Sequence, residues 1–392
     1  MSGRIVIVGG GLAAGTAAAG LRDAGYDGDV VLHAAEPHLP YERPPLSKGY
    51  LAGDAEADSM LVHPASWYAE NDVEVRPGSR VERIDADAHT VTAGGATESF
   101  DRLLIATGAS PRHLAAADES GAPVAYLRTR EDSDRLRSVL APGHRIAILG
   151  GGFLGLEVAA AARNAGADVI VLEALDLPLL RVLGPEMGAM FADLHREHGV
   201  DLRLGAKVTG FDGDGRRARL TVDGSADVEA DLLVVGIGAS PDVALAEAAG
   251  LAVDDGILVD ERMRTSHPDV YAAGDVARAH HPVLGRSIRV EHWDNAIRQG
   301  RVAGQAMAGV EDAAATDLPY FFTDQYDLGM EYVGDVGPDG YDEVVVRGDL
   351  TKRVFKAYWV SGGKVVAAMQ ANDWDASDSL RPAIGKSLAE LS

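Results

Sequence analysis

Along the chain, short apolar runs of β-branched residues alternate with longer Ala-rich stretches, a pattern typical of an α/β protein. Residues 5–8 are an unbroken run of branched apolar side chains, as in a parallel strand buried on both faces. A glycine turn follows, then an Ala-rich stretch through about Ala24, and then a second predicted strand at 29–32 ahead of Glu36. This order predicts a β–α–β unit at the start of the chain.

The turn of this first unit has the spacing Gly-x-Gly-x-x-Ala. Gly9 permits the tight turn, Gly11 lets the backbone approach a pyrophosphate, and Ala14 lets the helix pack closely on the strand. The N-terminus of the following helix is favourable for an anion. We therefore predict a bound dinucleotide here rather than a purely structural glycine turn.

Residues 144–173 repeat the opening unit. A strand at 145–149 leads into a Gly-x-Gly-x-x-Gly turn, a helix and a second strand at 168–172, and the glycines of the turn are Gly150, Gly152 and Gly155. Residues 231–241 likewise repeat 101–111, with Gly238 in the place of Gly108. Two fingerprints, each with its closing strand, predict two dinucleotide-binding domains of one design.

An acidic residue follows the second strand of the second unit. Glu173 comes after Gly150 at close to the spacing of about 20 residues expected of the acid that accepts a ribose 2′-hydroxyl. A carboxylate there repels a 2′-phosphate, and the first arginine after it is Arg181. The pattern favours NADH over NADPH.

The segment after Glu36 is rich in proline and lacks periodicity, which predicts a rigid irregular loop. Such a loop would hold Arg43 and Lys48 in fixed positions beside the first dinucleotide, where cations meet a pyrophosphate or a cofactor ring. The alternative is that both are solvated surface charges.

Two further segments suggest cofactor contacts. An apolar strand ends in Gly274 and Asp275, and we expect a helix to follow, with the carboxylate at its start accepting hydrogen bonds from a polyol; a plain N-cap is the alternative. Trp293 precedes a helix expected from Asn295 to about Ala308 with Asp294 as N-cap. An aromatic residue there either packs in the core or covers a flavin ring.

Composition narrows the class of protein. The chain has 392 residues, a formal net charge of −24 and no cysteine. Dithiol catalysis, disulfides and thiolate metal sites are excluded, and we predict no metal site. The acidity argues against nucleic acid or an anionic membrane as partner. With no apolar run of 18 residues and a first strand that begins at once, we expect a cytoplasmic protein.

The last part of the chain has a different composition. Apolar runs at 344–346, 354–360 and 365–370 predict strands, with a hairpin turn at 361–363, and a helix is expected from about Ser377. No fingerprint lies in this segment. It is predicted to be a small antiparallel α+β domain.

In their order, these motifs resemble the FAD-dependent NADH:ferredoxin reductases, which are related to glutathione reductase. The resemblance covers nearly the whole chain and rests above all on RPPLSK at 43–48, LLIATGASPR at 103–112, GGGFLGLE at 150–157, VYAAGDVA at 270–277 and EHWDNAIRQG at 291–300. It implies an α/β fold of two Rossmann-like domains plus a C-terminal α+β domain. The implied boundaries are 1–112 with 243–311 for FAD, 113–242 for NAD, and 312–392.

The resemblance also implies roles for particular residues. Lys48, Glu157 and Trp293 are the implied catalytic residues; Glu157 resembles the acid at the nicotinamide that pairs with Lys48, and Trp293 the residue over the flavin. The implied contacts to FAD are Gly9, Gly11, Ala13, Ala14, Glu36, Arg43, Lys48, Val81, Gly108, Arg128, Asp275 and Trp293. Those to NAD are Gly150, Gly152, Gly155, Glu157, Glu173 and Gly238.

Two positions depart from the family's pattern. Relatives often have an acid where Ala35 stands, so the contact to the FAD ribose falls to Glu36. Leu177 stands where relatives often have arginine, which weakens the expected grip on the adenosine end of NADH.

The implied activity is hydride transfer from NADH to FAD, followed by single-electron transfer to a two-iron two-sulfur ferredoxin that serves a haem monooxygenase or a ring-hydroxylating dioxygenase. The ferredoxin is expected to dock near Arg298 and Arg301, although internal salt bridges are an equal alternative for these arginines. The chain is expected to be a monomer or a weak homodimer. Alternatives are a rubredoxin or another acceptor, or a slowly turning-over flavin interaction protein like apoptosis-inducing factor.

Overall fold

The computed structural model describes residues 3–391, which divide into two compact units. Unit 1 comprises residues up to Arg43, Ala57–Ser110 and Ser240–Tyr320. Unit 2 comprises Pro44–Glu56, Pro111–Ala239 and the chain from Phe321 onward. In the described range no helix is long and apolar enough to cross a membrane.

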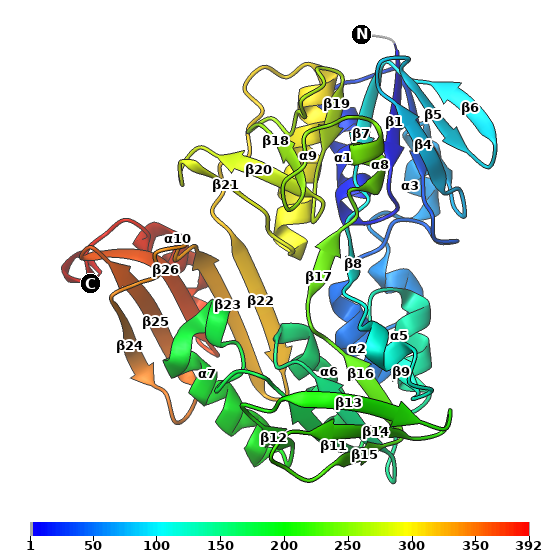
Figure 1. The fold of residues 1–392 in the computed structure, drawn as a ribbon. Coiled ribbons are helices and arrows are strands. Elements are labelled where there is room, and N and C mark those ends of the chain that lie inside the picture. The colour runs from blue at the N-terminus through cyan, green and yellow to red at the C-terminus, as the bar shows by residue number, and fades with distance from the viewer. Residues whose placement is uncertain (1–2, 392) are drawn as a thin grey trace. The chain divides into compact units, whose positions relative to one another are not determined.

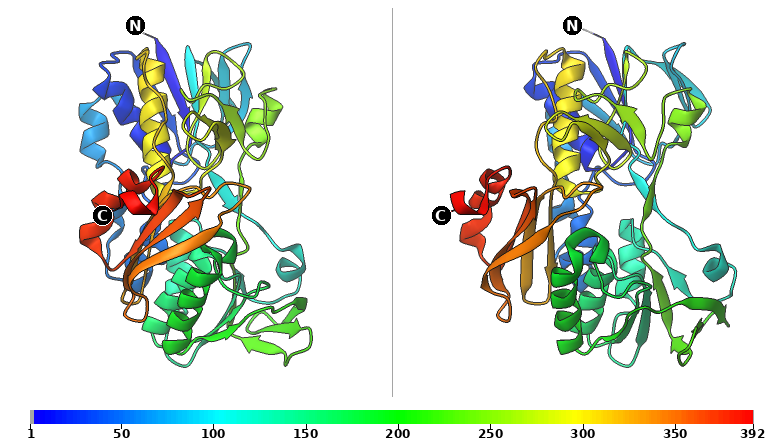
Figure 2. Two further views of the ribbon diagram at one scale, coloured as in Figure 1. Left: turned by 90° about the vertical axis from the view of Figure 1, so that its left-hand side faces the viewer. Right: turned by 60° about the vertical axis from the view of Figure 1, so that its left-hand side comes forward.

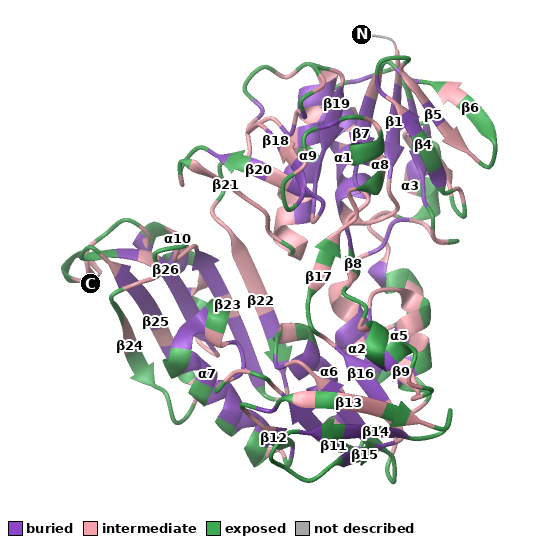
Figure 3. Ribbon diagram, viewed as in Figure 1, coloured by how far each residue is buried: buried purple, intermediate pink, exposed green. Residues whose placement is uncertain are grey.

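The core of unit 1 is a five-stranded parallel sheet in the order β19-β7-β1-β2-β3 (Figure 1). Its central strands are almost fully buried, as the apolar run at 5–8 predicts (Figure 3). The strands of this sheet are β1 (Arg4–Val8), β2 (Asp29–His33), β3 (Val73–Arg76), β7 (Arg102–Ile105) and β19 (Val270–Ala272).

Two helices of unit 1, α1 (Leu12–Asp23) and α9 (Trp293–Ala308), lie side by side (Figure 2). Glycines make this close approach possible. A Cβ on Gly300 would lie 2.5 Å from the Ala13 carbonyl oxygen, and one on Gly304 would lie 2.4 Å from that of Ala17. Residues far apart in the sequence thus close around the first glycine turn.

The remaining elements of unit 1 form two small sheets and short helices. These are the antiparallel sheet β4 (Val81–Asp85), β5 (Thr90–Ala93) and β6 (Ala96–Ser99); the sheet β18 (Ile257–Val259), β20 (Ala277–His281) and β21 (Arg286–Ile288); the helices η2 (Ala57–Met60), α3 (Ala65–Glu70) and α8 (Ala244–Ala248). The chain passes between the units within β8 (Ala109–Pro111) and β17 (Ala239–Pro241), and also after Arg43, Glu56 and Tyr320.

Unit 2 contains the second parallel sheet, in the order β12-β11-β10-β16-β9. Its strands are β9 (Val124–Ala125), β10 (Arg145–Leu149), β11 (Asp168–Leu172), β12 (Asp201–Arg203) and β16 (Leu232–Val235); its helices are α4 (Ala115–Asp118), α5 (Arg130–Arg137), α6 (Phe153–Asn164) and α7 (Leu180–Glu197); an antiparallel sheet adds β13 (Val208–Gly213), β14 (Ala218–Val222) and β15 (Val228–Ala230).

The predicted repeat extends to single hydrogen bonds. Asp101 accepts the Arg4 amide at 2.6 Å in unit 1, and Asp231 accepts the Arg145 amide at 2.8 Å in unit 2. In each case the acid before the closing strand ties down the first residue of the central strand. The closing strands β7 and β16 pair in parallel with β1 and β10, so the two sheets share one design.

The C-terminal sheet also belongs to unit 2, with strands in the order β22-β23-β26-β25-β24. It packs on α7 through a buried cluster that contains Phe191 and Trp359, and the Trp359 indole donates to the Leu183 carbonyl at 3.2 Å. The bounds are β22 (Tyr320–Gln325), β23 (Leu328–Gly334), β24 (Glu343–Asp349), β25 (Val354–Ser361), β26 (Lys364–Ala371), η3 (Trp374–Ala376), α10 (Ser377–Ala383) and η4 (Leu388–Glu390). The predicted hairpin is confirmed: Gly362 and Gly363 both have positive φ between β25 and β26.

The predicted local structure is wrong at residues 37–48 and after Asp275. Residues 37–48 are not wholly irregular, because Pro44–Ser47 form the 3₁₀ helix η1, ahead of α2 (Gly49–Ala52). Proline is tolerated in a first helical turn, where its missing N–H has no intrahelical partner to lose. The chain after Asp275 forms a turn and then β20 rather than a helix.

Candidate functional site

The first glycine turn, residues 9–14, leaves room for an anion at the start of α1. We call this turn the first glycine cradle, and the equivalent turn at residues 150–155 the second. Gly9 has φ +143° and its N–H donates to the His33 carbonyl at 2.9 Å; a Cβ there would lie 2.1 Å from the Ala106 oxygen. Gly11 is the N-cap of α1 with no side chain capping it in the described chain, and a Cβ on it would meet nothing within 4 Å. The space beside the start of α1 is thus open, and this fits a dinucleotide pyrophosphate.

Ala13 and Ala14 lie in the first turn of α1 and are both buried. A Cβ on Gly274 would lie 3.0 Å from the Ala13 Cβ, and the Gly274 N–H donates to the Gln299 side chain of α9 at 2.9 Å. Asp275 is therefore placed beside the starts of α1 and α9 by tertiary packing, not by a helix of its own.

Glu36 is held by two neighbours in the loop that follows it. Its carboxylate accepts the Arg43 guanidinium at 2.8 Å and the Tyr41 hydroxyl at 2.5 Å. Burial lowers the pKa of Arg43, but the charges of Tyr41, Glu36 and Asp275 outweigh it and the pKa is raised. Arg43 is thus a fixed cation in unit 1.

Trp293 is the first residue of α9, one position inside the helix rather than before it. The expected N-cap Asp294 is wrong, because His292 takes that role and its ring accepts the Asp294 amide at 3.3 Å. Trp293 hydrogen-bonds to the Glu42 carboxyl, whose pKa is raised by burial and partly lowered again by this bond.

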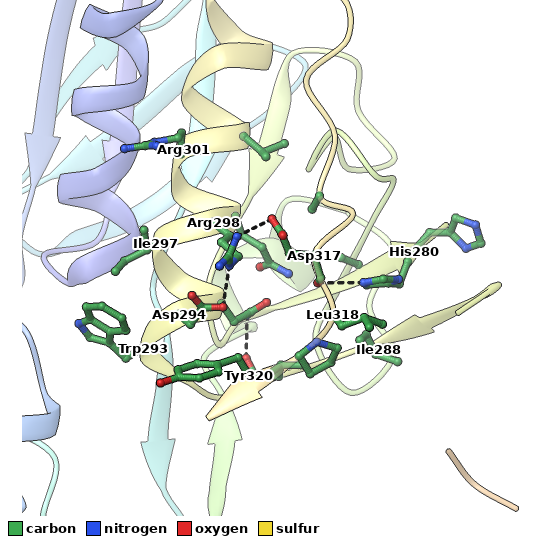
Figure 4. A pocket seen from close by; sticks show the side chains of 18 residues that line it. His280, Ile288, Trp293, Asp294, Ile297, Arg298, Arg301, Asp317, Leu318 and Tyr320 are labelled. Atoms are coloured by element: carbon green, nitrogen blue, oxygen red, sulfur yellow. Dashed lines mark hydrogen bonds and ion pairs between the residues drawn. The ribbon is translucent and has the colours of Figure 1, made fainter. Parts of the chain in front are cut away.

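A pocket of about 370 Å³ lies against α9 and is lined by Trp293, Arg298, Arg301 and Tyr320 among others (Figure 4). Arg298 contacts two carboxylates in it, Asp294 at 2.6 Å and Asp317 at 2.6 Å (Figure 4). Arg298 therefore forms internal salt bridges, the second of the two alternatives for this residue. Arg301 is exposed.

The second glycine turn, in unit 2, repeats the first. Gly150 has φ +109°, and a Cβ on it would lie 2.4 Å from the Gly236 oxygen. Gly152 caps α6 as Gly11 caps α1, and its missing Cβ also has nothing within 4 Å. A Cβ on Gly155 would lie 2.2 Å from the Gly150 oxygen, so only glycine permits this approach. The turn fits a second pyrophosphate.

Glu173 is fixed by backbone amides. One carboxylate oxygen accepts the Gly151 N–H at 2.5 Å and the other accepts the Leu175 N–H at 2.8 Å. The carboxylate therefore lies beside the second glycine turn, and a carboxylate in such a place is able to accept hydroxyl donors and disfavours phosphate.

Lys48 and Glu157 form a close ion pair within unit 2, at 2.6 Å. Glu157 is on α6 and its side chain is 7% exposed, against 18% for Lys48. The other carboxylate oxygen accepts the Ser47 hydroxyl at 2.5 Å. Lys48 also lies over the Phe322 ring, 5.5 Å from its centroid. The sequence did not single out Ser47, although it stands next to the lysine.

The remaining predicted contacts lie at strand ends and turns. Gly108 and Gly238 both have positive φ, and their carbonyls accept equivalent amides, those of Asp242 at 3.0 Å and Arg112 at 2.9 Å. Val81 is buried at the start of β4. Arg128 directly precedes the capped start of α5, and its amide donates to the Asp132 carboxylate at 3.1 Å.

One group of side chains in the described chain has metal-ligand character. His89, His267 and Asp269 bring ligand atoms within 4.8 Å of one another. The His267 Nδ1 already accepts the Asp269 amide at 3.3 Å, so this nitrogen is engaged. The sequence pattern predicted no metal site, and that stays a prediction.

Two glycine cradles of one design, each at the end of a parallel strand and the start of a helix, define a protein that binds two dinucleotides. The chain belongs to the pyridine nucleotide-disulphide oxidoreductase family, whose model matches residues 3–300. Residues 320–389 match the reductase C-terminal family.

Relatives cover almost the whole chain. It is 39% identical to putidaredoxin reductase of Pseudomonas putida over 380 residues, which is 94% of this chain and 88% of that protein. It is also 39% identical to the ferredoxin–NAD(+) reductase component of the anthranilate 1,2-dioxygenase system of Burkholderia cepacia, covering 94% of this chain and 90% of that one. The crystal structure of a covalent putidaredoxin reductase–putidaredoxin complex matches with a TM-score of 0.94 at 36% identity, covering 99% of this chain and 95% of that one.

Proposed function

We propose that this chain is an FAD-dependent NADH:ferredoxin reductase that delivers electrons to a two-iron two-sulfur ferredoxin, which serves a haem monooxygenase or a ring-hydroxylating dioxygenase. The observation that carries the proposal is the pair of glycine cradles in a chain without cysteine. Two dinucleotides can bind, but no dithiol can receive the electron pair, so the electrons must leave the chain. The relative crystallised with putidaredoxin supports a ferredoxin as the acceptor.

FAD is assigned to the cradle of unit 1. Gly9, Gly11, Ala13 and Ala14 would hold its pyrophosphate, with Glu36, Arg43, Val81, Gly108, Arg128, Asp275 and Trp293 as further contacts. When bound, FAD supplies the redox chemistry, because it accepts a hydride from NADH and releases the electrons singly. The open space at Gly11 and the fixed cation Arg43 support this assignment.

NADH is assigned to the cradle of unit 2. Gly150, Gly152, Gly155 and Gly238 would surround its pyrophosphate, and Glu173 would accept its ribose hydroxyls. Lys48 would place a positive charge where negative charge develops during hydride transfer, and Glu157 would hold that lysine in position. The 2.6 Å contact between Lys48 and Glu157 supports the pairing.

The test is anaerobic stopped-flow mixing of the flavin-loaded protein with NADH, followed by mixing of the reduced protein with purified ferredoxin or with rubredoxin. Fast bleaching of the flavin and reoxidation by the ferredoxin are expected. Fast bleaching with reoxidation by rubredoxin alone would show that the acceptor is a rubredoxin and not a ferredoxin. Bleaching that takes minutes would instead favour a flavin interaction protein.

We propose that the ferredoxin docks beside α9, near Arg298 and Arg301. Ferredoxins are generally acidic, so a docking face on this acidic chain must be locally basic. Because Asp294 and Asp317 neutralise Arg298, the exposed Arg301 is the better electrostatic contact. Reversing Arg298 would also place a third carboxylate beside the two it now pairs with.

Arg301→Glu should lower the second-order rate of ferredoxin reduction several-fold at low salt, with a smaller effect at high salt, and leave NADH-dependent ferricyanide reduction unchanged. The matched control is Arg216→Glu, which reverses an exposed arginine in the turn between β13 and β14. Equal loss of both activities in Arg301→Glu, or equal loss of ferredoxin reduction in both variants, would disprove docking at this site.

We further propose a three-domain organisation, with FAD bound by 1–112 and 243–311, NAD by 113–242, and residues 312–392 forming the C-terminal domain. A monomer or weak homodimer in the cytoplasm suits a reductase that draws on cytoplasmic NADH. Limited proteolysis and sedimentation would test the boundaries and the assembly state.

A further inference from the structure

A continuous chain of hydrogen bonds runs through the interior of unit 2 and ends at Glu157. The Thr323 hydroxyl lies 2.6 Å from Glu157, the Gln325 amide nitrogen 3.1 Å from the Thr323 hydroxyl, and the Gln325 oxygen 2.8 Å from the His195 Nε2. The Tyr326 hydroxyl then lies 3.3 Å from the His195 Nδ1. The chain thus joins β22, α7 and α6.

The direction of every bond follows from the carboxylate. The carboxylate of Glu157 only accepts, so Thr323 donates to it, and the Thr323 oxygen must then accept from the amide nitrogen of Gln325. The Gln325 oxygen therefore faces His195, whose Nε2 must carry the hydrogen while Nδ1 accepts from Tyr326. All four donors point toward Glu157, an arrangement in which neighbouring hydrogen bonds strengthen one another.

The chain is buried where polar groups are costly. Thr323 and His195 are 0% exposed, Gln325 is 1% and Glu157 is 6% exposed. Burial lowers the pKa of His195 to about 4, so the ring is neutral at pH 7, as the single donor direction requires. An apolar side chain at these positions would avoid the desolvation cost, so the retained polarity points to a positioning role.

The carboxylate is held from two sides. Lys48 and Thr323 share one of its oxygens, and Ser47 donates to the other. A carboxylate with only the lysine and Ser47 as partners could rotate and take the ammonium group with it. The bond from Thr323 removes that freedom.

We propose that Thr323, Gln325 and His195 are positioning residues that lock the Glu157 carboxylate and, through it, fix the Lys48 ammonium for the reaction of NADH. This inference rests on the proposed function and deepens it. It predicts that the hydrogen bonding of Glu157 determines the tautomer of His195, and this tautomer can be measured without any cofactor.

The test compares Thr323→Val, which keeps the shape but removes the hydroxyl, with Thr323→Ser, which keeps the hydroxyl. The first readout is the tautomer of His195, from nitrogen NMR of the ligand-free protein, with His195→Gln to assign the signal. We expect one fixed Nε2–H tautomer in the wild type and in Thr323→Ser. We expect an exchange-averaged signal in Thr323→Val, because the Gln325 amide is then free to flip.

The second readout is the limiting rate of flavin reduction by NADH. Thr323→Val should lower it about tenfold with less than a twofold change in half-saturating NADH, and Thr323→Ser should stay within twofold of wild type. If Thr323→Val does not fold, Gln325→Met interrupts the same chain one step further from Glu157 and replaces it.

The two outcomes separate the inference from the proposed function. A wild-type protein that NADH does not bleach would refute the reductase assignment and leave the NMR result to decide whether the chain is coupled. If NADH bleaches the wild-type protein but Thr323→Val and Thr323→Ser behave alike in both readouts, the inference is overturned. The hydrogen-bond chain would then serve only packing.

Discussion

Replacing Glu173 by Gln should weaken the discrimination between NADH and NADPH. The carboxylate accepts backbone amides at 2.5 Å and 2.8 Å, so it is held over the second glycine turn rather than free to swing away from a nucleotide. Gln keeps the shape and one acceptor oxygen but removes the charge, and its NH2 group cannot accept one of the two backbone amides, those of Gly151 and Leu175. The change therefore tests electrostatic repulsion of a 2′-phosphate more than packing.

The magnitude follows from Coulomb's law. Two unit charges about 5 Å apart interact by about 3 kcal/mol at an effective dielectric constant of about 20. Glu173 is only partly buried, and solvent reduces this to about 1.5–2.5 kcal/mol. The ratio of kcat/KM for NADPH to that for NADH should accordingly rise about 10- to 70-fold in Glu173→Gln.

The assay is the rate of flavin bleaching across a concentration series of each nucleotide, with Glu197→Gln, an exposed acid at the end of α7, as control. Most of the gain should come from faster reaction with NADPH, while NADH loses a few-fold from its weakened ribose contact. An unchanged NADPH:NADH ratio in Glu173→Gln would refute the role of this carboxylate in nucleotide choice.

Further predictions concern stability and binding. Because the pKa of His195 is lowered to about 4 in the folded protein, the unfolded protein binds a proton at this residue more readily. The free energy of unfolding is therefore highest above about pH 6.5 and should fall by about 2–3 kcal/mol toward pH 4.5. His195→Gln should flatten that part of the pH dependence in urea unfolding, and a slope equal to that of wild type would contradict the assignment. Gly152→Ala should keep the wild-type melting temperature, since its Cβ meets nothing within 4 Å, yet weaken NADH binding at least tenfold. Gly150→Ala should lower the melting temperature, since its Cβ would lie 2.4 Å from a carbonyl oxygen; similar behaviour of the two variants would be evidence against the cradle.

The parts of the fold that depend on local sequence were predictable. Each of these features is defined by a few neighbouring residues: the apolar strands, the glycine turns and the repeat of 101–111 at 231–241. The predicted strands at 145–149 and 168–172 coincide with β10 and β11. A positive φ at Gly9 or Gly150 follows from the fingerprint alone.

The errors arise where tertiary packing decides the local structure. Asp275 looked like the start of a helix, but its turn is fixed by Ala13 and Gln299, which lie in other parts of the sequence. His292 rather than Asp294 caps α9 because its imidazole nitrogen accepts the amide of Asp294. A residue count cannot distinguish between two polar residues two positions apart that are both able to cap.

The hydrogen-bond chain at Glu157 was also missed, although one signal pointed to it. Thr323 and Gln325 alternate along a strand and so share one face, and the period of two places both polar groups inward. Nothing local reveals that His195, from α7, meets them. Long-range pairs of this kind require the fold.

The position of β19 and α9 in unit 1 has a consequence for synthesis. β19 adds to the edge of the first sheet beside β7, and α9 closes against α1, but both follow the whole of residues 106–269. On the ribosome the parallel sheet of unit 2, which ends at Val235, is complete before unit 1 can close. The first glycine turn therefore lacks its neighbours β19 and α9 until the last third of the chain has been synthesised. Truncated chains should thus acquire the NADH-binding fold without being able to retain flavin.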